Sequence, residues 1–185
     1  MTFIRRAGGN GRRRPPVETG AAMVELSFVL PILVALVFGI IDFGFAFNSY
    51  ISERQGAAQG GRQAIVANFG SNSTCPLTGL TGAGSNALET KQLMCLVKDR
   101  VGLDEAKTRV GVSFGTGGYA VGAPVLVCVE YPLSSVTNFY GALLDGKVLK
   151  SKTEMRIEQV TTSSGADAFA AAAETPQSGS WSWCA

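Results

Sequence analysis

Apolar residues are spread unevenly along the chain, and the longest uncharged apolar run lies near the amino terminus, over residues 26–41. At about 1.5 Å per helical residue the run spans roughly 24 Å, slightly less than a hydrocarbon core of about 30 Å. Three phenylalanines after Asp42 lengthen it enough. The pattern predicts one membrane-spanning helix over about residues 26–47, which includes Leu26, Pro31, Gly39, Asp42 and Phe47. Asp42 would lie near one interface, where a carboxylate can reach water or a partner.

The helix is expected to continue beyond the span, to about residue 68. Aliphatic and small residues recur at helical spacing on one face, and Glu53 falls largely on another; the stripe comprises Phe47, Ile51, Ala57, Ala58, Gly61, Ala64, Ile65 and Phe69. Glycine costs about 1 kcal/mol relative to alanine in a helix, so the glycines here need a packing reason. We expect packing on the chain's own sheet in the outer half, and a subunit interface in the membrane half.

The remainder predicts a small α+β domain. A loop over 70–86 precedes a helix over 87–101, for which Gly102 is a terminator. Alternating apolar residues predict strands over 108–114, 125–131 and 147–160. Between the last two, residues 134–144 could form a short helix that turns Val136, Phe139, Tyr140 and Leu143 inward. Residues 161–185 are rich in Ser, Gly and Ala and predict a flexible, peripheral tail with a helical patch around residues 166–174.

Charge sets the predicted topology. The segment before the span holds five arginines and the next cation after it is Arg54, so the positive-inside rule predicts a cytoplasmic amino terminus and an extracytoplasmic domain. Residues 1–20 carry five Arg and one Glu, a charge of +4, which leaves −2 of the overall +2 for the rest of the chain. A basic surface for nucleic acid is therefore not expected outside this segment.

Gly20 and Glu25 have the spacing of a prepilin signal. A prepilin peptidase cuts after a glycine and leaves a glutamate as the fifth residue of the new chain, which here would begin at Ala21. A charged residue at the start of an apolar helix favours a functional partner, although Glu25 could instead lie at the level of the lipid headgroups. The small-x-small site of an ordinary signal peptidase is poor after the apolar run, which would therefore stay in the product.

These residues carry a family resemblance. The stretch from Gly20 to Leu33, with Phe38-Gly39-Ile40-Ile41-Asp42-Phe43-Gly44 after it, resembles the TadE-like family of minor pseudopilins in tight-adherence (Flp-type) pilus systems. Residues 59–64 are similar to the family's Arg-Glu-Gly-Ala-Arg segment, with Gln59 and Gly60 in place of Arg and Glu, and residues 155–158 resemble its late strand. The resemblance implies a pilin-like α+β fold divided into a leader (1–20), a long helix (21–70), an extracytoplasmic domain (71–160) and a tail (161–185).

The resemblance also implies the function and the partners. A processed subunit would assemble with other pilin or pseudopilin subunits and an assembly platform, and Glu25 would neutralise the new amino group of a neighbouring subunit, which sets the register. A different hypothesis stays open, that of a single-pass, membrane-tethered binding or sensor domain that keeps its amino terminus. The mass of the mature protein distinguishes the two.

Catalysis is not expected. The chain has no histidine, which removes the commonest general base and histidine-containing zinc sites, and no spacing singles out another nucleophile and base. We expect neither an enzyme nor a cofactor or metal. The four cysteines lie after the span, where an oxidising compartment favours disulfides. Three connectivities are possible; we favour Cys75 with Cys95 and Cys128 with Cys184.

Overall fold

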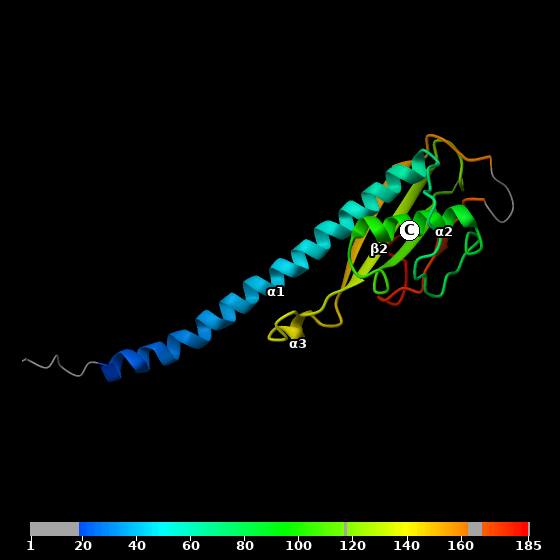
Figure 1. Ribbon diagram of the computed structural model, residues 1–185. Helices are drawn as coiled ribbons and strands as arrows, with labels where there is room; N and C mark the ends of the chain where they lie inside the picture. Colours follow the sequence, from blue (N-terminus) through cyan, green and yellow to red (C-terminus); the bar gives the residue numbers. More distant parts are fainter. Residues whose placement is uncertain (1–18, 117, 163–167, 185) are drawn as a thin grey trace, which may run out of the picture. The chain divides into compact units, whose positions relative to one another are not determined.

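The computed structural model describes residues 19–116, 118–162 and 168–184 (Figure 1). The chain forms two compact units, Met1–Val37 and Phe38–Ala185. Most of the predicted leader, residues 1–18, lies outside the described residues. In the first unit, the described residues belong to the beginning of helix α1, Thr19–Ile65. Pro31 lies inside this helix, as the sequence predicts.

The second unit is built on a four-stranded antiparallel sheet in the order β3-β2-β1-β4. Its strands are β1 (Arg109–Phe114), β2 (Pro124–Pro132), β3 (Val148–Arg156) and β4 (Ala172–Ala173). The α+β fold class, with a long apolar helix before a small antiparallel sheet, is thereby confirmed. The three strands expected from alternation are present, and β3 is shorter than expected because the chain leaves the sheet after Arg156.

Helix α2, Leu88–Val101, and the outer part of α1 cover one face of the sheet (Figure 1). Helix α2 ends at Gly102, whose φ of 65° suits a residue without a side chain and whose N–H donates to the Lys98 carbonyl. The apolar side of α2 and the valines of β1 and β2 close a core against the outer part of α1 (Figure 1). The buried residues at its centre are Leu93, Met94, Val97, Val110, Val112, Val125, Val127 and Ile157.

The face of α1 that packs on this core consists of small residues. A β-carbon added at Gly56 would come within 2.8 Å of the Val101 backbone nitrogen, and one at Gly60 would overlap the Val97 Cγ2. One at Gly61 would meet the Met155 sulfur at 3.2 Å. Ala57 and Ala64 are fully buried. The glycines of the outer half thus allow close packing within the chain's own domain, as expected.

The predicted stripe on α1 is wrong in two respects. Phe47 and Ile51 are 65% and 52% exposed, whereas Glu53, assigned to another face, is completely buried. The expected stripe includes large side chains, whereas the close approach of α1 to Val101 and Val97 leaves no room for a side chain at Gly56 or Gly60. The packed face is instead defined by glycine and alanine, and Glu53 lies one turn before Gly56 on it.

The prediction of a flexible, partly helical tail is also wrong for the described residues. From 168 onwards the chain contains strand β4 beside β1, and Phe169, Ala172, Glu174 and Cys184 are buried. The Glu174 carboxylate accepts from the Val110 N–H at 2.9 Å and from the Lys98 ammonium at 2.9 Å. These long-range contacts override the helix propensity of the alanines.

Two disulfides join the segments proposed from the sequence. Cys75 pairs with Cys95, which ties the loop before α2 to that helix, and Cys128 pairs with Cys184 on the other face of the sheet. There Trp181 packs over Gly111, whose added β-carbon would lie 3.3 Å from the indole. The carboxylate of Glu130 accepts from the Trp183 Nε1 at 3.0 Å and from the Gln177 N–H at 2.8 Å. The end of the chain therefore covers the second face of the sheet.

Candidate functional site: the amino-terminal helix

Gly20, Ala21 and Glu25 all lie on α1 and are exposed. None of the described residues forms an ion pair with the Glu25 carboxylate. Most of the residues on either side of it are large, apolar and exposed, as on a surface that faces lipid or other subunits. In this unit they are Met23, Val24, Leu26, Phe28, Val29, Leu30, Ile32, Leu33, Leu36 and Val37. The carboxylate therefore lies at the start of an apolar helical surface.

Among the described residues α1 is the one helix long and apolar enough to cross a membrane, with a mean hydropathy of 2.6 in its best window. None of that window is buried within the protein, unlike the central helix of a soluble domain. The helix therefore supports membrane anchoring, with the sheet domain outside the span. The direction in which it crosses remains a prediction from the arginines.

Asp42 is almost completely buried, at 2% exposed, by a loop of its own domain. One carboxylate oxygen accepts from the backbone N–H groups of Val136 and Thr137, each at 2.9 Å. The other accepts from the hydroxyls of Ser135 and Thr137, each at 2.7 Å. Of the two environments expected for Asp42, water or a partner, the structure has a partner within the chain, and four hydrogen bonds compensate the lost hydration.

This loop departs from the expected inward-facing helix. Only Gly141–Leu144 is helical (α3), and Val136, Phe139 and Leu143 are 59%, 53% and 56% exposed. The reason is that residues 135–137 donate hydrogen bonds to the Asp42 carboxylate from their N–H and hydroxyl groups. In that conformation they cannot form part of a helix. The Ser135 N–H donates to Asp145 at 2.9 Å, which closes the loop on itself.

Two aromatic contacts, one on each side of Asp42 in the sequence, also hold the loop on α1. Phe139 packs edge-on against Phe38 at 5.6 Å between ring centroids, and Tyr140 lies 6.2 Å from Phe43. A β-carbon added at Gly39 would lie 3.4 Å from the Tyr140 ring. At Gly39, therefore, the close neighbour lies within the chain, whereas a subunit interface is the expectation for the glycines of the membrane half. At Gly44 nothing lies within 4 Å, and the expectation stays a prediction.

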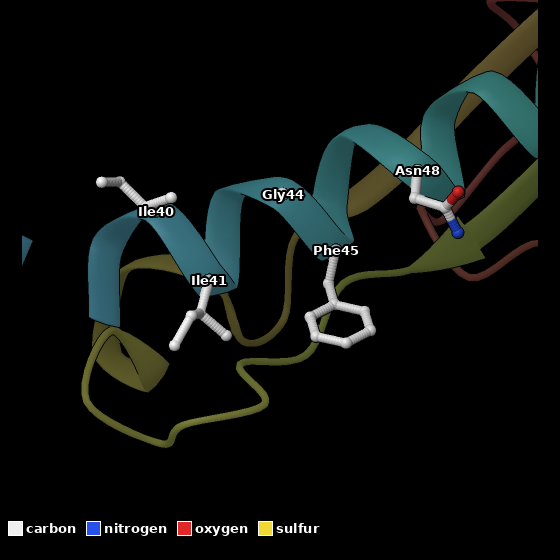
Figure 2. Close-up of a pocket in the computed structure, with 5 residues that line it drawn as sticks. All are labelled: Ile40, Ile41, Gly44, Phe45 and Asn48. Carbon is white, nitrogen blue, oxygen red and sulfur yellow. The ribbon is translucent and has the colours of Figure 1, made fainter. Parts of the chain in front are cut away.

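Figure 2 shows the part of α1 around Gly44. An open hollow on α1 is lined by Ile40, Ile41, Gly44, Phe45 and Asn48, with Ile41 and Phe45 projecting from the same side of the helix. The side chains that line it are apolar except for that of Asn48. Such a hollow has no group that could act as a nucleophile or a base.

Glu53 is the one functional candidate in this helix that sequence reasoning missed. It is completely buried and neither carboxylate oxygen has a hydrogen-bond partner among the described residues. Burial, and to a smaller degree the negative charge of Glu130, raise the pKa of Glu53 to about 8. Its spacing from Gly56 and Gly60 is the signal that could have revealed it. By contrast, the buried Lys98 is paired with Glu174 at 2.9 Å, although its burial lowers its pKa.

Within the described ranges no group of three His, Cys, Asp or Glu side chains could hold a metal ion, and all four cysteines are in disulfides. Among the described residues, the carboxylates on α1 are therefore the candidate functional groups. They differ in environment: Glu25 is exposed, Asp42 is buried and hydrogen-bonded, and Glu53 is buried and unpaired.

Residues 20–62 match the family model described as TadE-like protein. The resemblance stated from the sequence is confirmed over this segment, which begins at Gly20 and contains Glu25, Asp42 and Glu53. The match indicates a role in the assembly of a tight-adherence pilus. Neither the curated proteins nor the solved structures contain a match to this chain.

Proposed function

We propose that this protein is a minor pseudopilin that takes part in the assembly of a tight-adherence pilus and is processed after Gly20 by a prepilin peptidase. The observation that carries the proposal is the family match over residues 20–62, whose first residue is the predicted last residue of the leader. The exposed apolar surface of α1 supports it. During assembly a subunit exchanges contacts with lipid for contacts with the helices of other subunits, and this exchange needs an exposed apolar surface. The function is structural, without catalysis.

In this proposal Glu25 sets the register of assembly. Cleavage creates an amino group at Ala21, and the Glu25 carboxylate of one subunit neutralises the amine of its neighbour. An unpaired charge among apolar helices is costly, so correct pairing favours one axial position over others. The exposure of Glu25 and the absence of an ion-pair partner for it among the described residues leave the carboxylate available for this contact.

Processing is tested by amino-terminal sequencing and intact mass of the protein extracted from membranes. The expected chain starts at Ala21 and gains the mass of four hydrogens on reduction of its two disulfides. Gly20→Ile should abolish the shorter form. A mature protein that starts at residue 1 or 2 would reject processing and favour the tethered binding or sensor domain.

The role of Glu25 is tested with Glu25→Ala. We expect membrane insertion and both disulfides to be retained, and the amount of the subunit in sheared pilus fractions to fall at least about tenfold, which corresponds to 1.4 kcal/mol. Glu154→Ala is the matched control, because it removes the same charge from an exposed strand position. Recovery of Glu25→Ala in pili at the wild-type level would exclude the pairing role.

A further inference from the structure

The loop over residues 133–146, the apolar loop, presents large hydrophobic side chains to its surroundings. Val136, Phe139 and Leu143 are each more than half exposed, although a short loop of a water-facing domain usually turns such side chains inward. The loop has a single charged side chain, Asp145, which already accepts the Ser135 N–H. Apart from this carboxylate, the loop exposes no charged side chain.

The apolar loop is fixed to α1 and is not a loosely attached hairpin. Four hydrogen bonds hold residues 135–137 on Asp42, and Phe139 packs on Phe38. Phe38 precedes Asp42 by about one helical turn, or roughly 6 Å along the axis. The exposed tip of the loop therefore lies beside residues that fall within the predicted span, 26–47.

The surface of the apolar loop is continuous with that of the helix beside it. The same stretch of α1 carries further exposed apolar side chains, namely Ile40, Ile41, Phe43, Phe45 and Phe47. Once this part of α1 is in a bilayer, acyl chains surround it. The loop that packs against it is then also in contact with acyl chains. Aromatic residues such as Phe139 and Tyr140 are favourable at that depth.

We propose that the apolar loop is a membrane-inserted segment, whose Val136, Phe139 and Leu143 side chains lie among lipid acyl chains at the interface. Interfacial elements of this kind reach roughly 5–10 Å below the headgroups, which matches the one turn between Asp42 and Phe38. The hydrogen bonds from the loop allow the Asp42 carboxylate to enter this depth without bulk water. The proposal rests on membrane anchoring by α1 and adds a second lipid contact, from the sheet domain.

The test places a photo-crosslinking amino acid, p-benzoylphenylalanine, in the full-length protein. The protein is reconstituted in vesicles of phosphatidylethanolamine and phosphatidylglycerol. The probe replaces Phe139 or, in a second variant, Leu143. Ile40, which is 74% exposed on α1, is the positive control, and Val121, 64% exposed in the turn before the other end of β2, is the negative control. Intact mass without reductant verifies both disulfides in each variant.

We expect lipid adducts at positions 139 and 143 to approach the yield at position 40 and to exceed that at 121 about tenfold, as for a group among acyl chains. Adducts at 40 but not at 139 or 143 would overturn the inserted loop and leave the proposed function intact. Adducts to a second copy at 139 in place of lipid would also overturn it and identify a subunit contact. Absence of adducts at 40 as well would reject membrane anchoring, and with it both proposals.

Discussion

Asp42 and Glu53 lie eleven residues apart on one helix, and both are buried, yet their carboxylates have opposite environments. A loop that folds onto Asp42 supplies four donors to it. Glu53 faces the core between α1 and the sheet, where neither oxygen has a partner among the described residues. The first carboxylate is stabilised as an anion by its hydrogen bonds, whereas the second is stable in the core as a neutral acid.

The difference shows how each carboxylate acts on the fold. Asp42 organises a loop, because an ionised group in an apolar segment requires donors and residues 135–137 adopt the conformation that provides them. Glu53 holds no other segment by hydrogen bonds, and it lowers the stability of the folded domain whenever it is ionised. Buried carboxylates of one helix can thus have opposite effects, and the count of donors around each distinguishes them.

The largest effect is expected from the pH dependence of stability. The pKa of Glu53 is about 8 in the folded protein, above its ordinary value of 4.5. Below 4.5 both states are protonated. Between 4.5 and 8 only the unfolded chain ionises, so the free energy of unfolding falls by up to about 1.4 kcal/mol per pH unit, several kcal/mol in all, and levels off above 8. Denaturant unfolding of the detergent-solubilised, disulfide-intact protein at pH 5 and pH 8.5, followed by tryptophan fluorescence, measures it.

Glu53→Gln cannot ionise and should remove most of this pH slope. Glu154→Gln, an exposed position, is the matched control and should leave the slope unchanged. An identical slope in wild type and Glu53→Gln would show that Glu53 reaches water or a partner when the protein is in solution, and the contrast with Asp42 would disappear.

A local effect is expected from Asp42→Ala. It removes the acceptor of four hydrogen bonds, and the loss is limited because the released donors of residues 135–137 can reach solvent when the loop opens. We expect about 2–3 kcal/mol of local destabilisation, seen as roughly a hundredfold faster amide exchange at Val136 and Thr137. Hydrogen exchange with mass spectrometry on the peptide over 133–146 measures it.

Asp145→Ala is the control for that experiment, because it removes only the acceptor of the Ser135 N–H. Its expected cost is about 1 kcal/mol. Equal protection of the loop in Asp42→Ala and wild type would mean that the aromatic contacts with Phe38 and Phe43 suffice to hold it.

The smallest effects are expected from alanine at two glycines of α1. Gly56→Ala introduces a β-carbon 2.8 Å from the Val101 backbone nitrogen, which cannot yield easily, and should cost about 1–3 kcal/mol. Gly44→Ala meets nothing within 4 Å and should change stability by less than about 1 kcal/mol. Thermal unfolding of both variants compares them. An equal shift would show that α1 does not approach α2 as closely as the core around Glu53 requires.

Much of the fold follows from local pattern. The apolar run predicts α1, alternation predicts β1 and β2, and Gly102 predicts the end of α2, because each signal acts on nearby residues. Part of the candidate site is predictable, because Gly20 and Glu25 have the spacing of a prepilin signal. The position of Asp42 at an interface was expected for its charge, but its donors from residues 135–137 were not, because nothing local links two segments so far apart in sequence.

The remaining errors also have physical causes. Helical spacing places Glu53 largely off the apolar stripe, and carboxylates are rarely buried without a partner, so its burial is not expected from the sequence. The alanines near the carboxyl terminus favour a helix by propensity, yet Ala172 and Ala173 pair with β1, and Glu174 is held by Lys98. In both cases a contact between segments distant in sequence decides the outcome, and a single sequence records no trace of it.

The position of β4 determines when the domain can fold during synthesis. The edge of the sheet, the buried Glu174 and the Cys128–Cys184 bridge all need residues that the ribosome adds more than a hundred positions after α1 ends. The apolar helix α1 is therefore complete while the nascent chain still lacks the residues that close the core of the domain. The order of synthesis therefore delays closure of the core until well after α1 has been made.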